Sequence, residues 1–205
     1  MNDPNLNTLL KWGVENSNVS EAAEAPKTQL TPEALAALFG GNQKSDAQMM
    51  KDNMEVIKRE DCDMEDRITA FDNFEQLIEN LDNANNLESL GLWIPLIEQL
   101  ENKEAELRRF AAWCIGTAVQ NNIKTQEKLL VLGAIPTLVR MATGNDETKV
   151  KKKAITALSS SVRNFQPALD DAVLHVPADF KPSGKLDAND MDSVDILINK
   201  LREAL

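Results

Sequence analysis

The stretches LRRFAAWCIGTAVQN, residues 107–121, and VKKKAITALSSSVRN, residues 150–164, carry one helical pattern twice, 43 residues apart. Seven positions keep their character: Leu107, Ala111, Cys114, Ile115, Ala118, Val119 and Asn121 correspond to Val150, Ala154, Ala157, Leu158, Ser161, Val162 and Asn164. A third copy lies 41 residues earlier, at Ala70, Phe74, Leu77, Ile78 and Asn80. This spacing gives an apolar stripe broad enough to bury one helix face against neighbours on both sides.

A second helix accompanies each of the two later copies. Ile94-Pro95-Leu96-Ile97 recurs 41 residues on as Ile135-Pro136-Thr137-Leu138, and a proline is tolerated where a helix begins. Pro177 falls another 41 residues on. A period of 41 to 43 residues is the length of two or three stacked helices, so the sequence predicts an all-α, armadillo-like superhelical solenoid of helical repeats.

A stack of repeats needs helices that seal its ends, because each repeat exposes two apolar flanks. Residues 46–59 are predicted to cap one end and residues 190–205 the other, which gives a repeat domain over 46–205. After Asn164 the repeat pattern is lost, and residues 176–188 are predicted to be loop because Pro177, Pro182 and Gly184 fall there. Residues 1–45 are rich in Asn, Ala, Glu, Ser and Pro and are predicted to be a flexible N-terminal segment.

Composition and motifs exclude several classes of function. The 205 residues include 22 Lys and Arg against 33 Asp and Glu, and a net charge of −11 disfavours nucleic acid as a partner. We expect no membrane association and a cytoplasmic protein, since no long apolar run and no secretory leader pattern occurs. His175 is the only histidine, Cys62 and Cys114 are far apart, and no phosphate-binding, zinc-protease or serine-nucleophile motif occurs. We therefore expect no metal, no cofactor and no catalysis.

Asparagine is the residue that recurs just after the buried helix of each copy. It is found in the segment from Asn80 to Asn86, in Asn121-Asn122 and in Asn164. One interpretation is structural, because Asn and Asp end helices and order turns. The other is functional, because a row of amides along one concave ridge can donate and accept hydrogen bonds with a partner. The sequence leaves both open. Trp113 is predicted to be packed in the core, and the sequence leaves the position of Trp93 open.

The amino-acid sequences of two segments resemble a known family. Residues 70–86, AFDNFEQLIENLDNANN, and residues 115–122, IGTAVQNN, closely resemble the armadillo-type nucleotide exchange factors of the 70-kilodalton heat-shock chaperones, with the fungal branch most similar. The resemblance reaches the N-terminal segments at 9–12 and 35–41. It implies a co-chaperone without catalytic groups that grips the chaperone's nucleotide-binding domain, so that ADP leaves.

The resemblance also implies which residues make contact. Carried onto the matching positions, the chaperone-binding residues are Asn80, Asp82, Asn83, Ala84, Asn85 and Asn86, with Asn121, Asn122 and Asn164 as repeats of them. The N-terminal segment looks like a pseudo-substrate for the chaperone's peptide-binding site, with Leu9, Leu10, Trp12, Leu35 and Phe39 as its apolar residues. From spacing alone, these five residues fit a lid on the solenoid equally well. We expect the protein to be a monomer.

The main alternative is an armadillo adaptor that binds an extended basic peptide, which the acidic charge would favour. Nuclear-import armadillo proteins, as a resemblance, use Trp-x-x-x-Asn ladders. Here Trp113 is followed four residues later by Thr117, and neither matching copy supplies a tryptophan. The residues therefore favour the exchange factor over the adaptor.

Overall fold

The computed structural model describes residues 10–14 and 44–205 of the chain, which divides into two compact units, Met1–Ser45 and Asp46–Leu205. In the first unit, residues 10–14 are helical. Within the described ranges there are helices and no strand, and no helix there is long and apolar enough to cross a membrane. The second unit is an armadillo-like helical solenoid, as predicted.

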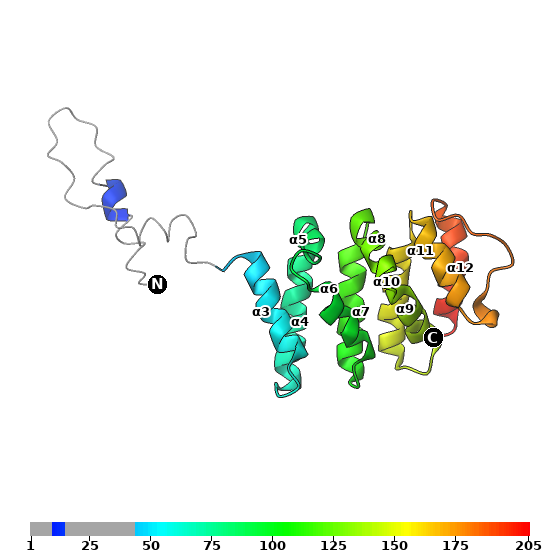
Figure 1. Ribbon diagram of the computed structural model, residues 1–205, viewed down its shortest axis with the longest axis horizontal. Helices are drawn as coiled ribbons and strands as arrows, with labels where there is room; N and C mark the ends of the chain where they lie inside the picture. Colours follow the sequence, from blue (N-terminus) through cyan, green and yellow to red (C-terminus); the bar gives the residue numbers. More distant parts are fainter. Residues whose placement is uncertain (1–9, 15–43) are drawn as a thin grey trace, which may run out of the picture. The chain divides into compact units, whose positions relative to one another are not determined.

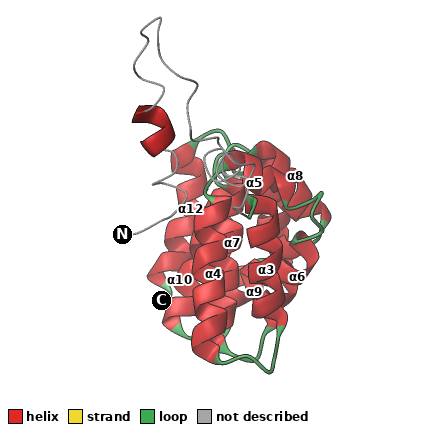
Figure 2. Ribbon diagram, turned by 90° about the vertical axis from the view of Figure 1, so that its left-hand side faces the viewer, coloured by secondary structure: helices red, strands yellow, loops and turns green. Residues whose placement is uncertain are grey.

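The second unit contains these helices: α3 (Asp46–Lys58), α4 (Met64–Ile78), α5 (Leu81–Asn86), α6 (Trp93–Glu98), the 3-10 turn η1 (Gln99–Glu101), α7 (Ala105–Val119), α8 (Ile123–Val131), α9 (Ala134–Thr143), α10 (Thr148–Val162), α11 (Gln166–His175), the 3-10 turn η2 (Ala178–Phe180) and α12 (Met191–Glu203). Figure 1 shows them succeeding one another along the stack, with α5, α8 and α11 at one edge. In Figure 2, α4, α7, α10 and α12 lie on one side of the unit, and α3, α6 and α9 on the other.

The long helices of the first side repeat with a fixed period. Helices α7, α10 and α12 begin at residues 105, 148 and 191, each 43 residues after the last. The segment after Asn164, where the sequence pattern is lost, forms α11, which buries Ala168, Leu169 and Ala172. The three-helix repeat therefore continues beyond Asn164, with η2 in place of a full second helix and α12 as the third.

The two ends of the stack bury apolar residues on one side only. Helix α3 buries Met50, Met54 and Ile57 and packs against α4. Helix α12 buries Val194, Leu197, Ile198 and Leu201 and packs against α10, while Leu205 lies beyond its end and is exposed. Asp190 begins α12 by accepting a hydrogen bond from the backbone N–H of Asp192.

The core depends on a close approach of α7 and α10. A Cβ added at Gly116 would lie 3.2 Å from the Cα of Ala157, so only a residue without a side chain fits there comfortably. Nine of the residues of α7 are buried, because α4 covers one flank and α10 the other. One narrow stripe of α7 is left for solvent, at Glu106, Arg109, Trp113 and Thr117.

Replacing Gly116 by valine should destabilise the stack by about 1–3 kcal/mol, because the added methyl groups force α7 and α10 apart. Urea unfolding followed by circular dichroism measures the effect. Thr156→Val is the matched control, since Thr156 is exposed on α10 and its change should stay within about 0.5 kcal/mol. Equal stability of the Gly116 variant and the unaltered chain would contradict the close-packing argument.

Candidate functional site

The residues expected to contact a chaperone gather along one edge of the second unit. Six of them, Asn80, Asp82, Asn83, Ala84, Asn85 and Asn86, form α5 and its N-cap, and Asn121, Asn122 and Asn164 stand at the turns before α8 and α11. Helix α5 contacts α8, and α8 contacts α11. The topology therefore brings the predicted residues into one row, at the upper edge in Figure 1.

Three members of this row are buried and serve the fold. The Nδ2 of Asn83 donates to Asp46 Oδ2 at 2.7 Å and to the carbonyl of Leu77 at 2.9 Å. The Nδ2 of Asn122 donates to Asn85 Oδ1 at 3.2 Å, which ties α8 to α5. Ala84 is 2% exposed. The expectation that Asn83, Ala84 and Asn122 face a partner needs correction, and an arginine at Ala84 would disturb the packing.

Three further members end or begin helices. The Oδ1 of Asn80 accepts hydrogen bonds from the backbone N–H groups of Asp82 and Asn83, which caps α5. Asn121 and Asn164 have φ values of 52° and 58°, the left-handed conformation that Asn tolerates and that ends α7 and α10. The structural interpretation of the asparagines therefore holds for these positions. Asn80, Asp82, Asn86, Asn121 and Asn164 are nevertheless exposed.

A groove joins this edge to the face formed by α4, α7 and α10. It has a volume of about 490 Å³ and is lined by Glu75, Glu79, Trp113, Thr117, Gln120 and Asn121. Thr117 Oγ1 donates to Glu75 Oε1 at 2.6 Å across the α4–α7 contact. Asn121 is thus the predicted residue that the structure places in a hollow of the surface.

Trp113 is the groove residue that sequence reasoning missed. Trp113 was expected to be packed in the core, but it is half-buried, whereas Trp93, which the sequence left open, is 3% exposed. The Trp113 ring stacks on Phe110 with centroids 5.7 Å apart, and Lys153 Nζ lies 3.6 Å above the ring centroid. The available signal was position, because Trp113 shares one stripe of α7 with Arg109 and Thr117.

Charged groups next to Trp113 are linked through one carboxylate. Glu106 accepts hydrogen bonds from Arg109, and its Oε2 lies 2.8 Å from Lys149 Nζ. The hydrogen bond from Arg109, and then the one from Lys149, lowers the pKa of Glu106 to about 2. Burial lowers the pKa of Lys153, and repulsion by Arg109 adds to that shift. Arg109 and Lys153 therefore place positive charge next to Trp113, while Glu75 and Glu79 place negative charge on the groove side.

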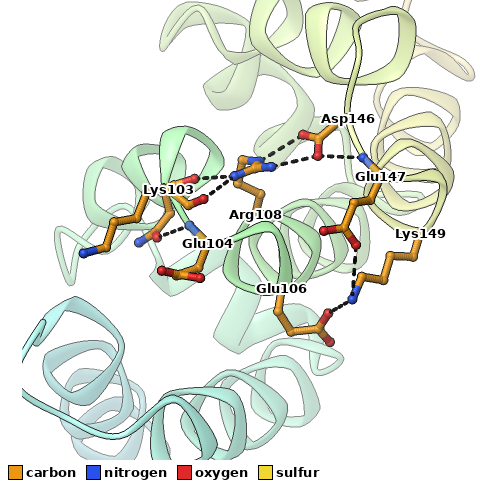
Figure 3. A network of polar contacts seen from close by, with 8 residues as sticks. Lys103, Glu104, Glu106, Arg108, Asp146, Glu147 and Lys149 are labelled. Atoms are coloured by element: carbon orange, nitrogen blue, oxygen red, sulfur yellow. Dashed lines mark hydrogen bonds and ion pairs between the residues drawn. The ribbon is translucent and has the colours of Figure 1, made fainter.

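A second polar network is centred on Arg108, also near the start of α7, and its role is structural. Figure 3 shows Arg108 between two loops: its Nε and Nη2 donate to Asp146 at 2.9 and 2.7 Å, and its Nη1 donates to the carbonyls of Asn102 and Lys103. The hydrogen bond from Arg108 lowers the pKa of Asp146. The network fixes the loop before α10 against the loop before α7, which keeps the repeats in register.

Of the apolar residues expected to form the pseudo-substrate, two lie in the described part of the chain. Leu10 and Trp12 belong to the helical residues 10–14, with exposed fractions of 60% and 37%. Leu9, Leu35 and Phe39 lie outside the described residues.

The described residues offer no catalytic or metal-binding constellation. Over 10–14 and 44–205, no group of three or more His, Cys, Asp and Glu side chains could hold a metal ion. Burial raises the pKa of the Cys114 thiol, which disfavours the reactive thiolate form.

Comparisons with known proteins give a consistent picture. A family model described as "Nucleotide exchange factor Fes1" matches residues 6–87, and one described as "SIL1/FES1/HPBP1 C-terminal domain" matches residues 83–175. The Hsp70 nucleotide exchange factor FES1 of Gibberella zeae is 52% identical over 100% of this chain and 99% of that relative. The protein of the same name from Coccidioides immitis is 48% identical over 98% of both.

A solved structure resembles the fold. The crystal structure of an engineered protein covers 96% of this chain and 80% of its own, with a TM-score of 0.55 and 15% sequence identity. At that identity the likeness concerns the fold alone.

Lowering the pH should weaken the contacts of Glu106 with Arg109 and Lys149 within a defined pH range. Because Arg109 and Lys149 lower the pKa of Glu106 to about 2, its contribution to stability is present above its ordinary value of 4.5 and is lost as the pH falls from there to about 2. Its size is about 1 kcal/mol, since solvent screens the partly exposed pairs. The measurement is the free energy of unfolding of the unaltered chain and of Glu106→Gln between pH 7 and 2.

The difference between these two proteins should shrink across that window. Glu127→Gln is the control, because Glu127 is exposed on α8 and makes no ion pair among the described residues. A pH-independent difference for the Glu106 variant would contradict the assignment.

Proposed function

Because the chain belongs to the Fes1 family of nucleotide exchange factors, we propose that it binds an Hsp70 chaperone and accelerates the release of bound ADP. The observation that carries this proposal is the extent of the likeness, which is 52% identity over the full length of a relative with that name. The two family matches overlap at residues 83–87, inside the asparagine-rich edge. The protein is a co-chaperone and not an enzyme.

The physical basis of exchange is a coupling between two ligands of the chaperone. A protein that prefers the open form of the nucleotide-binding domain lowers the domain's affinity for nucleotide. Bound nucleotide lowers the affinity for that protein by the same factor. Couplings of about 1–3 kcal/mol change affinity roughly 5- to 150-fold. The solenoid supplies binding energy for this purpose and no bond-making group.

The contact surface combines the exposed part of the asparagine-rich edge with the adjoining groove. Asp82, Asn86, Asn121 and Asn164 are exposed polar groups, and Asn121 also lines the groove. Amides can donate and accept, so they suit the polar rim of a protein interface. Asn83, Ala84 and Asn122 support this surface from beneath.

The N-terminal segment acts on the chaperone's peptide site in this proposal. The exposure of Leu10 and Trp12 supports it, because apolar side chains in solvent are available to a peptide-binding groove. The compartment is the cytosol. Two free cysteines, of which Cys62 is partly exposed, fit a reducing compartment.

The direct test is stopped-flow release of a fluorescent ADP from an Hsp70 chaperone in the presence of excess unlabelled nucleotide. The chain should raise the release rate about 5- to 150-fold at saturation, the range of typical couplings. An unchanged rate would refute the proposed function.

Adding a measurement of peptide displacement to this assay distinguishes the role of the N-terminal segment from the role of the solenoid in ADP release. The double variant Leu10→Ser/Trp12→Ser should release ADP at the unaltered rate, because both residues belong to the first unit. It should displace a fluorescent peptide from the chaperone more slowly than the unaltered chain. An identical rate of peptide displacement would remove the pseudo-substrate role.

Asn121 allows its structural and contact roles to be distinguished. Asn121→Gly keeps access to the observed φ of 52° and should keep the melting temperature close to that of the unaltered chain. If the amide contacts the chaperone, this variant loses affinity by about fivefold, as for one hydrogen bond of about 1 kcal/mol. Titration of the chaperone with the folded variant measures this affinity. An affinity equal to that of the unaltered chain would exclude Asn121 from the contact.

A further inference from the structure

The charge of α10, the helix that packs against α7 and its Trp113, is opposite to the charge of the chain as a whole. The chain carries a net charge of −11, yet α10 contains four lysines and no acidic residue. Lys149 is paired with Glu106 and Glu147, but Lys151, Lys152 and Lys153 form no ion pair among the described residues. Lys153 therefore lies over the half-buried ring of Trp113 without a carboxylate partner, and Lys152 lies one helical turn from Lys149, which reaches Glu106 of α7.

The side chains of Trp113, Lys153 and Arg109 are held in place by their neighbours. Trp113 is fixed from beneath by the stack of Phe110 on Phe71, whose ring centroids lie 5.8 Å apart, and Lys153 is fixed above it. Arg109 is held by Glu106 and lies over the Phe110 ring at 4.2 Å. A partner that binds here therefore orders few mobile side chains, which lowers the entropic cost of association.

The local charge determines which partner fits. At physiological salt charges are screened beyond about 8 Å, so the lysines of α10 act on groups that come into contact, while the acidic remainder disfavours a long polyanion such as nucleic acid. A folded protein surface with a few carboxylates matches both conditions. Tryptophan is also among the residues that dominate binding energy at protein interfaces.

We propose that Trp113, Lys152 and Lys153 form a docking patch for a carboxylate-bearing surface of the Hsp70 chaperone, an inference that rests on the proposed function. The carboxylates lie against the ammonium groups, and an apolar part of the partner covers the Trp113 ring. The acidic groove residues Glu75 and Glu79 lie on the α4 side of the ring. The sign of charge therefore changes across Trp113, which orients the partner along the stack.

The test is the dissociation constant for a purified Hsp70 chaperone, measured by calorimetry with the full chain and its variants. Lys153→Glu and Trp113→Ala should each weaken binding about tenfold or more, and Lys152→Glu about threefold or more. Lys153→Arg keeps the charge and should bind within about twofold of the unaltered chain. Raising the salt from about 50 to about 300 mM should weaken the unaltered chain more than Lys153→Glu.

Lys185→Glu is the matched control, because it makes the same charge change in the exposed loop before α12 and should leave affinity unchanged. Circular dichroism verifies folding, and if Trp113→Ala unfolds, the exposed Lys152 carries the test. Variants that bind like the unaltered chain, or an equal loss for Lys185→Glu, would overturn the patch. If the unaltered chain neither binds the chaperone nor speeds ADP release, the proposed function itself has failed.

Discussion

The close approach of α7 and α10 is the constraint on which the rest of the structure depends. Gly116 and Ala157 let α7 and α10 pack closely together, and α4 covers the other flank of α7. A helix buried on two sides has one narrow stripe left for solvent. The groups that α7 can offer to a partner are therefore fixed by packing, and Trp113 is among them because it lies on that stripe.

The same packing divides the polar residues into two kinds. Asn80, Asn121 and Asn164 recur because each long helix must end and the chain must turn into the next repeat. Their recurrence is a property of the fold, and recognition can use them only where they remain exposed. The pair of Trp113 and Lys153 does not recur, because Thr156 stands 43 residues after Trp113 and Phe110 stands 43 residues before Lys153. Specificity for one partner is better carried by groups that differ between repeats, because identical groups cannot fix a register.

Repeats could be predicted from the sequence wherever a helix is covered on both sides. Val150 and Ala157 match Leu107 and Cys114 because α7 and α10 each have two neighbours. At the corresponding positions of α12 stand Ser193, which is half-buried, and Lys200, which is exposed, so the apolar pattern does not continue after Asn164. The site was harder to predict for a similar reason. Periodicity indicates that a residue is on a helix, but the exposure of Trp113 and the burial of Ala84 depend on neighbours 40 residues away.

Rigidity connects this architecture to exchange. A ligand shifts a conformational equilibrium only by the difference in its affinity for the two states. A soft solenoid would adapt to both forms of a chaperone and lose that difference, whereas a stack held by the α7–α10 contact and by the Arg108–Asp146 pair keeps one surface. The buried ties of Asn83 and Asn122 extend this rigidity to the asparagine-rich edge. In the proposed function, these structural residues contribute without touching the partner, because a rigid solenoid does not adapt to the closed form of the chaperone.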